Sequence, residues 1–103
     1  MKDVVELLAS IDGRPAVTIR GRNARYLHTL VQAGEKGVSP AIDDPMPRWS
    51  HYVYCLRSHF GAVIETVTEK HGNPYAGTHA RYVLRSRVEV HQVVRVGEKR
   101  YVA

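Results

Sequence analysis

Cysteine is nearly absent from this 103-residue chain, in which Cys55 is the only one. A single cysteine allows neither an intramolecular disulfide nor a cluster of thiolate zinc ligands, and it suits a reducing compartment such as the cytoplasm. Long apolar runs are also missing, because no stretch approaches the roughly 20 residues that a membrane-spanning helix needs. Acidic residues at Asp3, Glu6 and Asp12 argue against a signal peptide. We therefore expect a soluble cytoplasmic protein.

Catalytic and metal-binding signatures are lacking as well. We find no HExxH or CxxC pattern, no glycine loop that would cradle a phosphate, no Ser/His/Asp arrangement and no paired carboxylates. His51, Cys55 and His59 recur at helical spacing, but nothing nearby completes the convergent ligand set that a metal needs. We expect no enzyme activity, no metal and no cofactor.

An excess of positive charge is present instead, mainly in the second half of the chain. The formal net charge is +5. Residues 1–50 hold seven Lys and Arg against six Asp and Glu, whereas residues 51–103 hold eight against four. Such an excess favours polyanions, above all nucleic acid or an anionic membrane surface, and the alternative is that it serves solubility alone. The length fits one domain.

Apolar periodicity predicts four helical segments. The first is a short amphipathic helix over residues 3–11, and a clearer apolar stripe predicts a helix over residues 23–33. Ser39, followed by proline, is a helix-start signal, but Pro45 cuts that segment to one or two turns. Residues 47–59 form the last predicted helix, because their apolar side chains share one face.

Extended segments surround and follow these helices. Residues 16–19 are a brief β-prone run. Residues 63–69 and 81–90 are predicted strands, and the loop at 71–79 between them is rich in glycine and proline and too long for a tight turn. Residues 93–102 suggest a last small hairpin around a glycine.

This order of elements predicts an α+β winged helix-turn-helix fold. Such a fold has a three-helix core and a two-stranded β wing, here with an N-terminal helix and a C-terminal extension added. We divide the chain into an N-terminal amphipathic helix at 1–13, a winged-helix domain at 14–90 and a C-terminal strand or hairpin extension at 91–103.

The helix at 47–59 is the candidate reader of the DNA major groove. Only that groove admits a helix and distinguishes all four base pairs. The helix offers a polar face without any carboxylate, which a phosphate-lined groove would not repel. The candidate contacts are Arg48, Ser50, His51, Tyr54, Arg57 and Ser58. The alternative is that they form the solvated side of a core helix.

The wing and the start of the helix at 23–33 supply further candidates. Glycines in the wing loop would let the backbone approach phosphates or enter the minor groove. The wing candidates are Lys70, His71, Asn73, Thr78, His79 and Arg81, and the helix adds Arg22 and Arg25. An ordinary hairpin tip is the alternative for the loop.

Dispersed positions over about residues 14–88 resemble a known family. They are Arg22–Gly34, Gly37–Ser39, Tyr52, Val53, Leu56, Arg57, Gly61, Ile64–Thr66 and Ala80–Leu84. The pattern resembles that of small winged-helix proteins found mainly in alphaproteobacteria, a mostly uncharacterised group. This resemblance implies a winged-helix fold and DNA binding without identifying a target. The chain departs from the family at residues 43–47, which are acidic and broken by proline where such proteins usually carry a longer, less acidic helix.

We therefore expect a double-stranded-DNA-binding transcriptional regulator, associated with the nucleoid when bound, with no membrane partner. A homodimer is expected, because one small module buries little surface and binds weakly. The main alternative is a winged-helix module for protein interaction or dimerisation without direct DNA binding, with the chain termini supplying the contact surface. RNA or single-stranded DNA is a third possibility. The sequence makes no prediction about a small-molecule effector.

Overall fold

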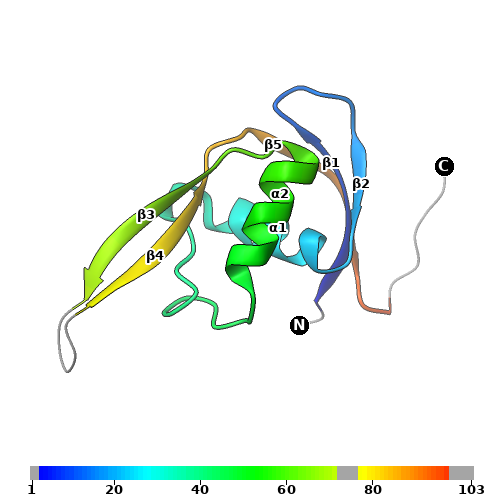
Figure 1. The fold of residues 1–103 in the computed structure, drawn as a ribbon. Coiled ribbons are helices and arrows are strands. Elements are labelled where there is room, and N and C mark those ends of the chain that lie inside the picture. The colour runs from blue at the N-terminus through cyan, green and yellow to red at the C-terminus, as the bar shows by residue number, and fades with distance from the viewer. Residues whose placement is uncertain (1–2, 72–76, 98–103) are drawn as a thin grey trace.

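The computed structural model describes residues 3–71 and 77–97, in which two strands are followed by the helices and then by three more strands. In order they are β1 (Val4–Ile11), β2 (Val17–Arg20), α1 (Arg22–Ala33), the short 3-10 helix η1 (Gly34–Lys36), α2 (Trp49–Phe60), β3 (Ile64–His71), β4 (Gly77–Leu84) and β5 (Val88–Arg95). Figure 1 shows a sheet on one side, the two α-helices in the middle, and the β3–β4 hairpin projecting away on the other side. No helix among the described residues is long and apolar enough to cross a membrane.

A three-stranded antiparallel sheet, ordered β2-β1-β5, forms the base of the fold. Its central strand β1 pairs Leu7 with Ile19 of β2 and with Val93 of β5. Leu7, Ala9 and Ile11 are buried, so this face of the sheet carries the core while α1 packs against it. The sheet joins the N-terminal and C-terminal parts of the described chain.

The predicted helix over residues 3–11 is wrong, because this segment is strand β1. As the central strand, the segment forms hydrogen bonds with a neighbouring strand on each edge. An isolated helix of this length would be only marginally stable. Leu7, Ala9 and Ile11 follow the alternation of a strand, but the pairing register shifts between Val4 and Glu6. This irregularity buries Val4 as well, and the resulting apolar spacing is the one that resembles a helix.

The two long helices agree with the sequence within two residues at each end. In α1, the apolar stripe includes Ala24, Leu27 and Leu30, which are completely buried. The predicted helix at 47–59 becomes α2, which begins at Trp49 because the preceding Arg48 adopts a left-handed backbone conformation with a φ of 65°.

The expected third helix of the core is not formed, so the prediction of a three-helix core is wrong. Between η1 and α2, all of whose residues are described, Ser39 starts only a turn: its carbonyl accepts from the backbone N–H of Ile42 and of Asp43. Pro45 has no N–H to continue this pattern. Asp43 also folds back to accept a hydrogen bond from the Ser39 N–H at 3.0 Å. The core therefore contains two α-helices, with η1 and a turn in place of the third.

The predicted strand over residues 81–90 is two strands, because the chain leaves the hairpin at Leu84 and joins the sheet at Val88. Asp12 holds the turn between them. Its carboxylate accepts from the Ser86 hydroxyl at 2.7 Å and from the Arg87 N–H at 2.9 Å. These two hydrogen bonds lower the pKa of Asp12. The predicted terminal hairpin at 93–102 is replaced by β5 as far as residue 95, and residues 98–102 lie outside the described part of the chain.

An aromatic cluster in the core fixes how α2 lies on α1. The rings of Tyr26 and Trp49 meet edge to face at 4.5 Å between centroids, and the Trp49 ring stacks on Tyr82 of the hairpin at 6.0 Å. The Tyr26 hydroxyl donates to the Pro47 carbonyl at 2.5 Å. With its Trp49, Val53 and Leu56 side buried in this way, α2 presents its opposite side to solvent.

Candidate nucleic-acid interface

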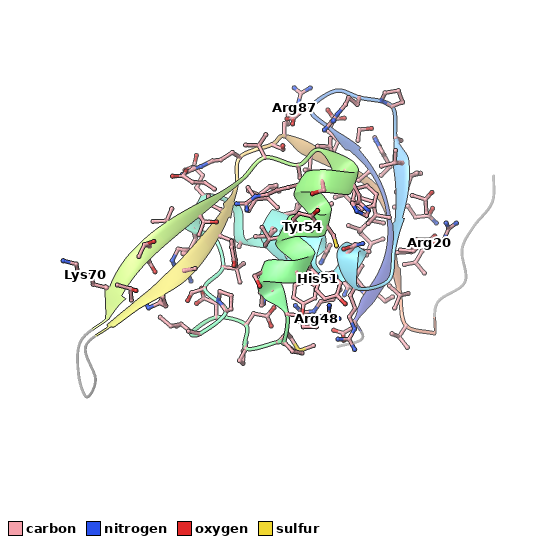
Figure 2. All side chains as sticks on the ribbon, in the orientation of Figure 1. Arg20, Arg48, His51, Tyr54, Lys70 and Arg87 are labelled. Carbon is pink, nitrogen blue, oxygen red and sulfur yellow. The ribbon has the colours of Figure 1, made fainter. Side chains whose placement is uncertain are left out.

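The outer face of α2 carries polar side chains and no carboxylate. We define it as Ser50, His51, Tyr54, Arg57 and Ser58, all of which are exposed. These positions recur at three- and four-residue intervals, so they form one continuous face opposite the buried one. Tyr54 lies at its centre with 63% of its surface exposed. Figure 2 shows Arg48 at the start of this helix and His51 and Tyr54 further along it.

Both ends of α2 are tied to the rest of the fold by side chains. At the end of the helix, one nitrogen of the Arg14 guanidinium donates to the carbonyls of Phe60 and Gly61 at 3.1 Å each. A cation beside the last carbonyls of a helix is favourable. At the start, the Trp49 indole N–H donates to the Asp44 carbonyl at 3.0 Å. The outer face is therefore presented on a firmly held helix.

The two faces of the β3–β4 hairpin differ in chemistry. Cross-strand pairing places Thr66 opposite Tyr82, Thr68 opposite Ala80 and Lys70 opposite Thr78. Paired residues point to the same side of a sheet, so these six share one face. Tyr82 packs on Trp49, which shows that this face is the one that continues toward α2. We call Thr66, Thr68, Lys70 and Thr78 the hydroxyl face.

The opposite hairpin face, which we call the ion-pair face, carries Glu65, Glu69, His79 and Arg81. Arg81 donates to Glu69 at 2.8 Å and to Asp43 at 2.8 Å, and His79 lies 3.0 Å from Glu69. The pKa of Glu69 is lowered, chiefly by the Arg81 hydrogen bond and then by that of His79. The pKa of Arg81 is raised by the same carboxylate. Arg81 and His79, which we predicted as DNA contacts, are therefore held by carboxylates on the face that points away from α2.

Arg25, another predicted contact, is also held by a carboxylate. Two of its nitrogens bond both carboxylate oxygens of Asp44, one of them at 3.0 Å. The side chains of Arg25 and Asp44 are only 19% and 15% exposed, and this hydrogen bonding raises the pKa of Arg25. The acidic segment that replaces the third helix thus neutralises one arginine of α1 and one of the hairpin. Arg22, at the first position of α1, is exposed.

Arg57 points from α2 to the base of the hairpin. Its Nε donates to the Ile64 carbonyl at 3.1 Å, and one terminal nitrogen donates to the Thr66 hydroxyl at 3.0 Å. The same terminal nitrogen also contacts the Ile64 carbonyl. Of the two arginines among the predicted contacts of residues 47–59, only Arg48 keeps its guanidinium off the backbone, lying 5.9 Å from the Tyr52 ring centre.

Thr66 and Thr68 belong to this surface but were missed from the sequence. The signal was present, since threonines at 66 and 68 alternate with glutamates at 65 and 69 along one predicted strand. Four predicted hairpin residues remain, of which two can be placed on a face of the hairpin and two cannot. Lys70 and Thr78 are exposed on the hydroxyl face. Asn73 and the side chain of His71 lie outside the described residues.

The outer face of α2 and the hydroxyl face together offer one surface without an acidic residue. It has cations at Arg48 and Lys70, hydroxyl groups between them, and the Tyr54 ring in the middle of the helix. Such a surface suits a ligand that is negatively charged and rich in hydrogen-bond acceptors.

Comparison with known proteins gives one family. The model described as "Winged helix domain" matches residues 16–94. A search of curated proteins and a search of solved structures found no match. The matched region begins just before β2 and ends within β5, so it contains both helices and the whole hairpin. Winged helix domains generally bind DNA, and the chain belongs to this family.

Proposed function

We propose that this protein is a DNA-binding transcriptional regulator without catalytic activity, located in the cytoplasm and on the nucleoid when bound. The observation that carries the proposal is the acid-free outer face of α2, which continues into the acid-free hydroxyl face of the hairpin. All four carboxylates of Asp43, Asp44, Glu65 and Glu69 are instead bonded to arginines elsewhere.

In this proposal α2 enters the major groove and reads base edges. Tyr54, His51 and Ser58 are the side chains that meet the groove floor, because they stand at the centre of the outer face. A tyrosine ring also makes apolar contact with the methyl group of thymine. Arg48, at the start of the helix, lies where it can bond a phosphate and fix the register.

The hairpin contacts the neighbouring sugar-phosphate backbone through its hydroxyl face. Lys70, Thr68 and Thr78 are exposed there and are donors suited to phosphate oxygens. This assignment leaves out Arg25, His79 and Arg81, which the sequence had predicted as contacts, because releasing them from their carboxylates would leave Asp43, Asp44 and Glu69 unpaired near DNA.

The test is binding to random-sequence duplex DNA, measured by fluorescence anisotropy over a range of salt concentrations. The Arg48→Gln/Lys70→Gln variant removes two charges from the proposed surface. The control, Arg20→Gln/Arg87→Gln, removes two charges from β2 and from the β4–β5 turn, and Figure 2 shows both residues away from Arg48, Tyr54 and Lys70. Each phosphate contact contributes about 0.9 to the log–log salt slope.

We expect the first variant to lose two phosphate contacts, which lowers the magnitude of the slope by about 1.8, while the control keeps the wild-type slope. Equal losses in both variants would mean that charge alone drives binding. No affinity even at low salt would overturn the proposal and leave a protein-interaction module as the better account.

We further propose that the protein acts as a homodimer on a palindromic site, because a single small module binds weakly. Within the described residues, β5 pairs with another strand along one edge only, and its other edge is suited to contact with a second copy. Sedimentation of the protein on DNA tests this, and a monomer both free and bound would contradict it.

A further inference from the structure

We infer that Arg57 is a positioning residue that sets the angle between α2 and the hairpin, so that both reach the same duplex. The inference rests on the proposed function for its DNA contacts, but the device itself is a property of the free protein. It departs from the prediction that Arg57 contacts DNA directly.

The geometry of the guanidinium supports this role. Its Nε and one terminal nitrogen, which form one edge of the planar fork, both face the hairpin. One acceptor is a backbone carbonyl at the first residue of β3 and the other is a hydroxyl two residues further on. The fork therefore spans the first two residues that share the α2-facing side of β3, which fixes the direction in which the strand leaves the core.

The length of the hairpin makes this direction important, because a small rotation at its base moves its far end by several ångströms. Lys70 lies six positions after Ile64, which corresponds to about 20 Å of extended strand. A rotation of about 10° at the base would therefore move Lys70 by about 3.5 Å, more than the length of a hydrogen bond. The side chain that fixes the base thus controls whether the far end of the hydroxyl face meets a phosphate.

Other contacts hold the hairpin to the preceding loop, because Val38 bridges Tyr82 through two backbone hydrogen bonds of 2.8 Å each and Asp43 accepts from Arg81, but they do not join it to α2. The Val63 N–H donates to the Ser86 hydroxyl at 2.7 Å, and the Val63 carbonyl accepts from the Arg85 N–H at 2.8 Å. These bonds join the hairpin to the following turn and not to α2. The stack of Tyr82 on Trp49 does join them, but a ring stack allows rotation in its plane more readily than a bidentate hydrogen bond.

The test uses Arg57→Lys, which keeps the charge but loses the fork, in the wild type and in a Lys70→Gln background. A positioning role predicts that Arg57→Lys lowers the salt slope by about 0.9, as Lys70→Gln does, because the Lys70 contact is lost. The same substitution then has no further effect on the slope when Lys70 is already absent. Thr66→Val, which removes the hydroxyl acceptor, should also lower the slope, and Thr66→Ser, which keeps the hydroxyl, should bind like the wild type.

A direct phosphate contact by Arg57 predicts the opposite pattern. Arg57→Lys would keep the wild-type slope, Thr66→Val would have no effect on it, and Arg57→Gln would lower it equally in both backgrounds. That result would overturn the inference while leaving the proposed function intact.

A measurement without DNA separates the two claims. Residual dipolar couplings of the free protein report the orientation of β3 and β4 relative to α2. We expect Arg57→Lys and Thr66→Val to change this orientation with the couplings inside α1 and the sheet unchanged. Wild-type couplings in both variants would contradict the inference, whatever the affinity for DNA.

Discussion

Arg25, Arg57 and Arg81 show how the role of a cation depends on the acceptors within its reach. All three are arginines on a basic chain, yet each is bonded to a group of the protein itself: Asp44, the base of β3, and the carboxylates of Glu69 and Asp43. Among the predicted contacts, Arg22, Arg48 and Lys70 remain as exposed cations. Positive charge counted from the sequence therefore overstates the charge that a DNA backbone would meet.

These pairings could not be predicted from the sequence alone. Arg81 and Asp43 are separated by 38 residues, and their meeting depends on the turn that replaces the third helix. By contrast, the exposed set on α2 was predictable, because a single helical period sorts its residues into buried and exposed faces.

The Arg81 network predicts a pH dependence of stability. The pKa of Asp43 is lowered by the Ser39 N–H and then by Arg81, from an ordinary 3.8, and that of Glu69 is lowered by Arg81 from an ordinary 4.5. Groups with lowered folded-state pKa values stabilise the fold fully above the ordinary values and lose this contribution as pH falls through the folded ones. Stability should therefore decline below about pH 4.5.

Urea unfolding of the wild type and of Arg81→Gln, between pH 7 and pH 3, checks this expectation. The variant should be less stable at pH 7 and should show a shallower decline in acid, because part of the pKa shift is gone. Parallel curves for the two proteins would show that Arg81 does not hold these carboxylates.

At the scale of elements, helices and the hairpin were predictable where one period ran without interruption. Strand β1 was not, because a register shift between Val4 and Glu6 gives it an apolar pattern that fits both periods. The division at 84–88 was also missed, since the residue that holds the turn is Asp12, which directly follows β1. Both errors arise because the contacts that decide these structures are made by residues distant in sequence. The domain boundaries at 13 and 90 stay a prediction.

The end of α2 gives an element-scale prediction at Gly61. This residue has a φ of 66°, and a side chain there would meet the Arg14 guanidinium that bonds the last carbonyls of the helix. Gly61→Ala should therefore lower the free energy of unfolding by about 1 kcal/mol for backbone strain, and further for the displaced Arg14.

The matched control is the same substitution in an Arg14→Ala background. Backbone strain at Gly61 then remains, but there is no Arg14 guanidinium for the added Cβ to displace. Chemical denaturation of Gly61→Ala in both backgrounds measures the difference. Equal losses would show that Arg14 does not stabilise the end of α2.

At the scale of the whole molecule, the carboxylates and the acid-free surface are arranged on different sides. The sheet and the aromatic core hold α2 from behind, and the loop at residues 39–44 binds the ion-pair face of the hairpin. Figure 2 shows His51 and Tyr54 on α2, away from the sheet, and Lys70 at the far end of the hairpin. Membership in the winged helix family agrees with DNA as the ligand, and the geometry adds which side of the hairpin should meet it.

The most direct test of this account is NMR mapping of the isotope-labelled protein during titration with duplex DNA at low salt. We predict that the largest amide shift changes follow Ser50, His51, Tyr54 and Ser58 on α2 and Thr68, Lys70 and Thr78 on the hairpin, with β2 and the outer side of β1 unchanged. Shift changes centred on Arg20 and the sheet, or none at all, would contradict the account.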